Sequence, residues 1–174
     1  MNPHDQRVMF SSDKMDWQTP AGLFDYVSRK VGGFDLDAAA HHSNHLCDRW
    51  LGPAGEWEDA LSDRPWCEAG NTIWLNPPYG RNVGAWVERA YRETVAPNLR
   101  VVCLIFARTD TQWWHDWVMK AELVQFIKGR IAFHRNGQSG QAAPAPSCLV
   151  HFRYTGEPIS PRKESLILPS EARR

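Results

Sequence analysis

Apolar and polar positions along the chain predict helices and strands in turn. Residues 20–31 place apolar side chains at helical spacing, and Gly32-Gly33 ends that pattern. Thr19 is predicted to cap this helix, with Pro20 at its first position. The same spacing returns over residues 82–95, so a second helix is expected to end before Pro97.

Short apolar runs predict strands. Residues 34–37 and 73–75 are brief, whereas residues 100–106 form a continuous apolar run typical of a strand buried on both faces of a parallel sheet. The order strand, turn, helix, strand over residues 73–106 predicts an α/β fold. Residues 41–71 are irregular and leave little room for a full strand-helix-strand unit, so the sheet is expected to be compact and abbreviated, with flanking helices.

The second half of the chain is expected to hold a hairpin, a loop and a last strand. Residues 122–127 and 131–133 flank Lys128-Gly129-Arg130, which predicts a hairpin with two cations at its tip. Gly, Gln, Ala, Ser and Pro dominate residues 136–147, which predicts a mobile loop, and residues 148–154 predict a last strand.

A single domain over residues 1–174 is expected. Residues 1–15 are predicted to form a flexible arm and residues 157–174 a loose, Pro-rich tail. Trp113, Trp114 and Trp117 are expected in the core or an interface rather than stacked on a base.

Composition is that of a globular enzyme domain without a bulk charge preference. Hydrophobic residues make up 43% of the chain, and 20 Lys and Arg balance 20 Asp and Glu. Any nucleic-acid contact must therefore come from a local patch of cations. No apolar run is long enough to span a membrane, and residues 1–10 lack a signal-peptide core, so a soluble, cytoplasmic protein is expected.

The four cysteines predict neither a zinc ribbon nor a redox dithiol, because no two of them form a C-x-x-C pair. His41, His42, His45 and Cys47 form the nearest approach to a metal cluster, but their spacing fits no standard zinc pattern. No metal is expected.

Asn76-Pro77-Pro78-Tyr79, at the end of the strand over residues 73–75, is the segment richest in chemistry. An amine conjugated to a purine ring is a poor nucleophile unless acceptors draw its lone pair back onto nitrogen. The Asn76 amide and a carbonyl freed by the prolines could accept both amine hydrogens. Pro77 and Pro78 would stiffen the turn, and Tyr79 could stack a base flipped out of a duplex. The alternative is an ordinary Asn-Pro turn.

Five segments in this order resemble the phage-type DNA N6-adenine methyltransferases, which use S-adenosylmethionine. The segments are Asp16–Pro20, Phe34–Ala40, Asn76–Tyr79, Ala107–Trp114 and Gly129–Phe133. The resemblance implies a Rossmann-like class I methyltransferase sheet, double-stranded DNA as partner, methyl transfer to a flipped adenine at Asn76–Tyr79, and no metal. The sequence departs from many methyltransferases, because no glycine-rich loop follows its first strand. It also departs from the family at Phe106, where a proline is usual.

The resemblance also implies a donor site. Asp35 or Asp37 would hold the donor's amino group or ribose, beside the small Ala38, and Trp17, Thr19 and Pro20 would close over it together with Asn76. Asp59 would face the donor's adenine. The open alternatives are that Asp37 caps a helix, and that Asp35 and Asp59 are exposed carboxylates.

Cations and two hydroxyl-bearing residues near the predicted turns are candidates for DNA contact. These nucleic-acid-binding candidates are Tyr79, Arg81, Arg108, Thr109, Lys128 and Arg130. An RNA adenine or a protein glutamine amide remains an alternative acceptor, and a catalytically silent nucleic-acid-binding module remains an alternative of another class. Host, oligomeric state and recognition sequence stay open.

Overall fold

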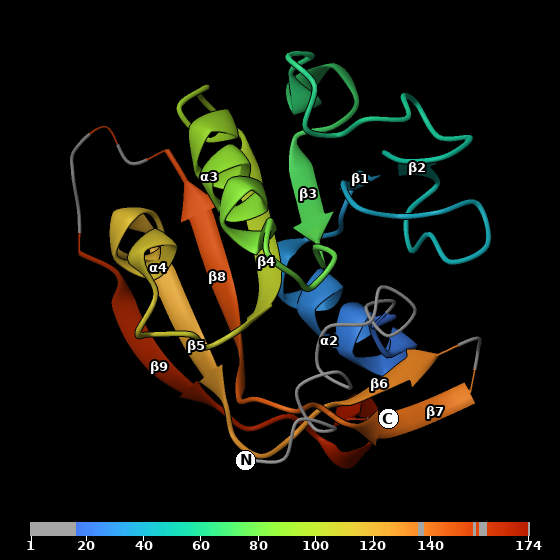
Figure 1. Ribbon diagram of the computed structural model, residues 1–174, viewed down its shortest axis with the longest axis vertical. Coiled ribbons are helices and arrows are strands. Elements are labelled where there is room, and N and C mark those ends of the chain that lie inside the picture. The colour runs from blue at the N-terminus through green and yellow to red at the C-terminus, as the bar shows by residue number, and fades with distance from the viewer. Residues whose placement is uncertain (1–16, 136–137, 155, 157–159, 174) are drawn as a thin grey trace.

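The computed structural model describes residues 17–135, 138–154, 156 and 160–173 (Figure 1). Its helices are α2 (Ala21–Val31), α3 (Val83–Glu93) and α4 (Gln112–Asp116), with 3₁₀ turns η2 (Trp66–Glu68), η3 (Val118–Lys120) and η4 (Ser170–Arg173). Its strands are β1 (Leu36–Asp37), β2 (Arg49–Trp50), β3 (Thr72–Leu75), β4 (Arg100–Phe106), β5 (Leu123–Ile127), β6 (Ala132–Arg135), β7 (Gln138–Ala142), β8 (Ser147–Arg153) and β9 (Arg162–Leu166). Among these described residues, no helix is long and apolar enough to cross a membrane.

Seven strands form one sheet in the order β2-β1-β3-β4-β8-β5-β9. Neighbouring strands are parallel except at β8, which runs antiparallel to both β4 and β5. The strands β1, β3, β4, β5 and β9 therefore end at the same edge of the sheet, and Figure 1 shows the arrows of β3 and β5 pointing toward it. We call this edge the carboxyl edge.

The chain changes direction across the sheet at β1. From β1 it steps outward to β2, and it then returns to the other side of β1 to form β3. In open α/β sheets, ligands bind outside the carboxyl ends of the strands at such a switch point. The topology alone therefore directs attention to the ends of β1 and β3.

Side chains pack on both faces of the sheet. One core cluster joins α3 and α4 to the sheet through Val87, Ala90 and Trp114. The other joins α2 to the opposite face through Leu23, Phe24 and Val27. Because β4 is covered on both faces, its five residues 101–105 are all buried, as its continuous apolar run predicts.

Several predictions are confirmed in detail. The strand over residues 100–106 matches β4, α3 lies within residues 82–95, and α2 ends where Gly32 adopts φ 90°. The abbreviated side of the sheet is also confirmed, since β1 and β2 are two residues long and η2 is the longest helical element described between residues 38 and 71.

The prediction that Thr19 caps this helix is wrong. Pro20, not Thr19, stands at the N-cap of α2, and no side chain caps the helix. Thr19 is instead buried in the wall of a cavity described below.

The predicted hairpin around Lys128-Gly129-Arg130 is also wrong. β5 pairs with β8 and β9 inside the main sheet, whereas β6 pairs with β7 in a separate two-stranded ribbon. A local apolar pattern does not identify the partner of a strand when that partner lies far along the chain. The predicted loop over residues 136–147 contains β7, and residues 136–137 lie outside the described residues.

The expectation of a loose tail is wrong for residues 160–173. β9 pairs in parallel with β5, and η4 packs against α2 through Leu168 and Ala172, which are 3% and 1% exposed. A few apolar positions in a charged segment were sufficient to dock it. The predicted arm over residues 1–15 lies outside the described residues.

Candidate active site

A cavity of about 490 Å³ opens at the carboxyl ends of β1 and β3. Its size is usual for a small-molecule ligand. Its walls come from the segment before α2, the loops after β1 and β2, the turn after β3, and α3. The residues of the wall are Trp17, Gln18, Thr19, Asp37, Ala39, Ala40, His41, Asn44, Leu46, Leu51, Gly52, Pro53, Glu58, Asp59, Ala60, Trp74, Asn76, Pro77, Pro78 and Trp86.

The NPPY turn (Asn76–Tyr79) brings an amide to this cavity directly after β3. Asn76 Nδ2 donates a hydrogen bond of 2.6 Å to the Trp17 carbonyl oxygen. Because a carbonyl only accepts, this contact identifies the amide nitrogen and directs the oxygen elsewhere. Asn76 Oδ1 is buried and has no hydrogen-bond partner among the described residues. The turn thus presents an unused acceptor on the cavity wall.

Two further polar atoms of the wall lack partners within the described ranges. They are the Thr19 hydroxyl and the Trp74 indole nitrogen, both buried. Buried polar groups in native proteins are nearly always hydrogen-bonded. Three unpaired polar atoms around one cavity therefore indicate that a polar ligand completes it.

Asp37 supplies a buried carboxylate at the end of β1. It is 3% exposed, and its oxygens accept from the backbone N–H groups of Leu46 at 3.1 Å and Ala39 at 3.4 Å. Burial raises the pKa of Asp37 to about 6, although these two hydrogen bonds and the nearby His45 act in the opposite direction. The predicted helix cap is not what Asp37 does here, because no helix begins in residues 38–40.

The wall is acidic. Asp37, Glu58 and Asp59 are its three carboxylates, and the described lining residues include no Lys or Arg. Such a cavity favours a cationic ligand.

The loop that carries Glu58 and Asp59 is tied to α3. The Arg89 guanidinium donates to the carbonyls of Ser62 and Arg64, and the Trp66 indole donates to the Ala60 carbonyl at 2.8 Å. Asp59 itself is exposed, and its carboxylate accepts the Leu61 N–H at 2.9 Å. The acidic part of the wall is therefore fixed by the fold.

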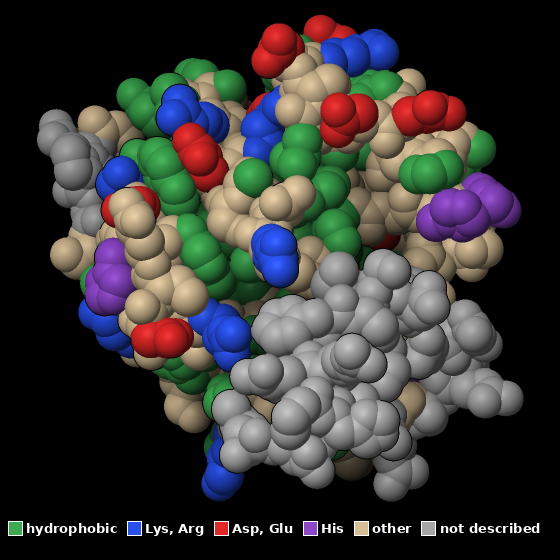
Figure 2. Space-filling view, in the orientation of Figure 1, with side chains coloured by type: hydrophobic (Ala, Val, Ile, Leu, Met, Phe, Trp, Pro, Cys, Tyr) green, Lys and Arg blue, Asp and Glu red, His purple; other side chains and the backbone are tan. Residues whose placement is uncertain are grey.

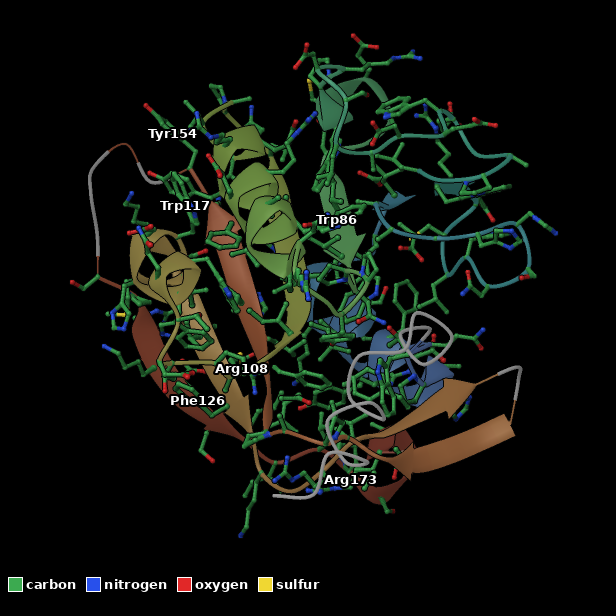
Figure 3. All side chains as sticks on the ribbon, in the orientation of Figure 1. Trp86, Arg108, Trp117, Phe126, Tyr154 and Arg173 are labelled. Carbon is green, nitrogen blue, oxygen red and sulfur yellow. The ribbon has the colours of Figure 1, made fainter. Side chains whose placement is uncertain are left out.

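Two indole rings flank the cavity. Trp17 lies edge-on to Phe133 with 5.7 Å between ring centroids, and Trp86 extends from α3, as labelled in Figure 3. Either ring offers a flat surface to a planar ligand.

Tyr79 is not brought to the cavity, and its predicted role as a stacking platform needs correction. Its ring is 8% exposed, its hydroxyl donates to the Leu104 carbonyl at 3.0 Å, and Phe106 stacks on it at 4.1 Å. Phe106 on β4 covers one face of the ring, and Phe133 meets the ring edge-on with 6.0 Å between centroids. In this structure Tyr79 attaches the NPPY turn to β4 through the hydrogen bond to Leu104 and the stacking with Phe106.

Three other predicted donor-site residues also lie outside the wall. Asp35 Oδ2 accepts the N–H groups of Asn71 and Thr72, both at 3.0 Å, so this carboxylate joins the chain before β1 to the start of β3. Pro20 accepts the first hydrogen bonds of α2, and the Ala38 N–H donates to Trp74 within the sheet. Of the two candidate aspartates, the structure brings only Asp37 to the cavity.

The predicted DNA contacts lie along the carboxyl edge rather than in the cavity. Arg81, Arg108, Thr109, Lys128 and Arg130 are all exposed. Arg108 follows β4 and Lys128 follows β5, and Figure 3 labels Arg108 at this edge. Figure 2 shows acidic side chains toward the top of this face and at its lower left, with Lys or Arg side chains among them.

Sequence reasoning missed several residues of the wall. Trp86 lies on the apolar face of α3 and was given no site role, while His41, Asn44 and Glu58 sit in irregular loops. Only the neighbouring acidic pair Glu58-Asp59 offered a signal. Among the described residues, no three His, Cys, Asp or Glu side chains gather to hold a metal ion, and Cys47, Cys67, Cys103 and Cys148 are free thiols.

The chain is similar in sequence to known proteins. A family model described as DNA N-6-adenine-methyltransferase (Dam) matches residues 8–166. A DNA N-6-adenine-methyltransferase of Haemophilus phage HP1 is 32% identical over 154 residues, which is 86% of this chain and 83% of that protein. One of Escherichia phage T1 is 28% identical over 142 residues, 72% of this chain and 56% of that protein, so the match spans little more than half of the T1 relative.

The fold has a counterpart among solved structures. A protein from Listeria monocytogenes, described as a class I S-adenosylmethionine-dependent methyltransferase, superposes with a TM-score of 0.53 at 12% identity, over 91% of this chain and 66% of that one. The expected class I methyltransferase sheet is therefore confirmed. By the extent of the family match and the HP1 relative, the chain belongs to the Dam family of DNA N-6-adenine-methyltransferases.

Proposed function

We propose that this chain transfers a methyl group from S-adenosylmethionine to N6 of an adenine in double-stranded DNA. The observation that carries the proposal is the buried Asn76 Oδ1, without a partner among the described residues, on the wall of an acidic cavity. Family membership supports the same reaction.

The cavity fits the donor. S-adenosylmethionine, when bound, supplies a methyl group on a cationic sulfonium, and it also carries an ammonium group. Three wall carboxylates and the absence of Lys or Arg from the described wall suit those charges. Asp37 would hold the ammonium group, the Thr19 hydroxyl and Asp59 would bind polar groups of the nucleoside, and Trp17 would cover it.

Asn76 would hold the acceptor amine. Its Oδ1 accepts one amine hydrogen, and the Pro77 carbonyl, which accepts no hydrogen bond from any described residue, takes the other. Both contacts favour a nitrogen whose lone pair is no longer shared with the ring. The bond from Asn76 Nδ2 to Trp17 fixes the amide in this orientation, so little reorganisation is needed during the reaction.

The adenine would have to leave the duplex to reach this cavity. Trp86, rather than Tyr79, offers an aromatic ring on the wall of the cavity that Asn76 also lines. Flipping of the adenine is helped when protein side chains hold the DNA backbone on either side of it through its phosphates.

The cations of the carboxyl edge would make those contacts. Cys148 on β8 pairs with Ile105 on β4 and with Phe126 on β5, so Lys128 stands level with the end of β4 and close to the height of Arg108. Since β8 separates the two strands, they lie about 10 Å apart, a length over which duplex DNA carries about six phosphate charges. Arg81 extends the same surface beside the NPPY turn.

The proposal is tested with S-adenosylmethionine carrying an isotopically labelled methyl group. The protein is incubated with unmethylated duplex DNA, the DNA is digested to nucleosides, and these are separated by mass spectrometry. Label in N6-methyldeoxyadenosine is expected. Parallel incubations contain RNA or a glutamine-containing peptide, and label found there but not in DNA would replace the proposal with one of the alternative acceptors. Absence of both label and donor binding would favour a silent module.

A further inference from the structure

The cationic turn Lys128–Arg130 is held by a residue beyond the family match. The family model ends at residue 166, and η4 follows it. Arg173, the last residue of η4, donates from Nη1 to the Lys128 carbonyl at 2.8 Å and from Nε to the Leu168 carbonyl at 3.1 Å. One guanidinium therefore joins the turn to the carboxyl-terminal segment.

The turn is shaped around that guanidinium. Gly129 adopts φ +86°, a conformation that L side chains rarely adopt. A Cβ added at Gly129 would also lie 2.6 Å from Arg173 Nη1. The positive φ explains why glycine stands between Lys128 and Arg130, and a side chain there would also displace the Arg173 guanidinium.

Arg173 is itself anchored. Leu168 and Ala172 are buried in the core on the α2 face, and the backbone of Glu171 lies directly against Gly22. The Lys128 N–H also donates to the Leu166 carbonyl at 2.9 Å, which ties the turn to the end of β9. Figure 3 labels Arg173 at the carboxyl edge, below the sheet.

The turn presents its own cations to solvent. Lys128 and Arg130 are exposed, and Arg130 Nη1 reaches the Ala143 carbonyl at 3.5 Å, next to the β6–β7 ribbon. Neither side chain forms an ion pair with a described carboxylate. Their charge is thus available to an anionic partner.

We propose that Arg173 is a positioning residue for DNA binding, which fixes the backbone of the Lys128–Arg130 turn so that both cations meet the phosphate backbone of the bound duplex. The inference rests on the proposed function for its partner, DNA. A turn whose backbone is already ordered avoids the entropy cost of ordering that backbone on binding. Loss of Arg173 should therefore weaken duplex affinity, while donor affinity and the rate at saturating DNA stay unchanged.

The test compares Arg173→Met and Arg173→Lys with the wild-type protein. Equilibrium binding to one duplex is measured over a series of salt concentrations, together with donor binding and the thermal midpoint. Both variants are expected to bind the duplex about fivefold more weakly, with a shallower salt dependence. Lysine keeps the charge but cannot donate to both carbonyls in a fixed fork, so wild-type affinity in Arg173→Lys would overturn the proposal.

Arg162→Met is the matched control. It removes one exposed cation from the same part of the chain, but Arg162 begins β9 and so lies at the opposite edge of the sheet. Its duplex affinity should remain within about twofold of wild type. An equal loss in both variants would mean that net charge alone matters, and would contradict a positioning role.

A double-variant comparison separates positioning from direct contact. If Arg173 acts through the turn, Arg173→Met should weaken binding no further once Lys128 and Arg130 are both Ala. Additive losses would mean that Arg173 contacts phosphate directly, and would also overturn the proposal. A wild-type protein without duplex affinity would refute the proposed function itself, whereas wild-type binding with an unaffected Arg173→Met would refute only this inference.

Discussion

The two halves of the carboxyl edge differ in burial and charge. At the ends of β1 and β3, the polar groups Asp37 and Asn76 Oδ1 are buried around an acidic cavity. At the ends of β4 and β5, Arg108, Lys128 and Arg130 are exposed. The difference teaches how a chain of zero net charge can bind a cationic donor and an anionic polymer at one edge. The described cavity wall carries carboxylates and no Lys or Arg, whereas the candidate DNA-contacting cations lie at the ends of β4 and β5.

The largest expected effect is in the buried half. Asn76→Ala removes the unpartnered acceptor, so the methylation rate at saturating substrates should fall by about 100-fold or more. Duplex affinity should stay within a few-fold of wild type, because the exposed half is unchanged. Asn82→Ala is the control, since Asn82 is exposed nearby and its side chain makes no capping bond. Full activity in Asn76→Ala would contradict the assignment of the chemistry to the buried half.

The reciprocal change is in the exposed half. Lys128→Ala combined with Arg130→Ala should weaken duplex binding by about tenfold and reduce the slope of log affinity against log salt by about 2. Fluorescence anisotropy over a salt series measures both quantities. An unchanged slope would show that these cations do not contact phosphate.

The acidity of the cavity predicts a pH dependence of donor binding. Burial raises the pKa of Asp37 from 3.8 to about 6, so the folded protein holds this proton more tightly than the unfolded chain between about pH 4 and 6. The stability that this group contributes is therefore present at low pH and is lost as pH rises through 6. A cationic donor needs the carboxylate form, and its affinity should fall by about tenfold between pH 7 and pH 5.

Calorimetric titration of S-adenosylmethionine at a series of pH values checks this expectation. Asp37→Asn should bind the donor weakly at every pH and lose most of the dependence. His41 also lines the cavity and His45 acts electrostatically on Asp37, so His41→Gln and His45→Gln are measured beside it. A dependence that disappears in a histidine variant but persists in Asp37→Asn would assign it to the imidazole.

The smallest effect concerns Tyr79, at the border of the two halves. Tyr79→Phe removes the hydrogen bond to the Leu104 carbonyl but keeps the ring against Phe106, so the free energy of unfolding should fall by about 1 kcal/mol. Methylation should stay within about twofold of wild type. Denaturant unfolding and a methylation rate assay test these two outcomes. A large loss of methylation rate without loss of stability would mean that the Tyr79 hydroxyl acts on the substrate.

The sequence predicts elements set by local spacing better than the pairing of segments that lie far apart in the chain. The run over residues 100–106 and the helix after the NPPY turn depend on local spacing, which periodicity reports directly. The partners of β5 and the docking of η4 depend on contacts between segments distant in sequence, which local pattern does not encode.

The candidate site follows the same division. Asn76 and Asp37 were found because each directly ends a short strand, where α/β folds bind ligands. The stacking role of Tyr79 failed because its packing against Phe106 on β4 cannot be read from the turn alone. Trp86 was missed because helical spacing does not separate a cavity wall from a core.

Single-turnover methylation of one duplex at saturating protein, measured beside the duplex dissociation constant, tests the central claim most directly. The account predicts that Asn76→Ala keeps its affinity and loses its rate, while the Lys128→Ala, Arg130→Ala protein loses affinity and keeps its rate within about twofold. A lowered rate with unchanged affinity in the latter protein, or a retained rate in Asn76→Ala, would contradict the division of chemistry and DNA binding between the two halves.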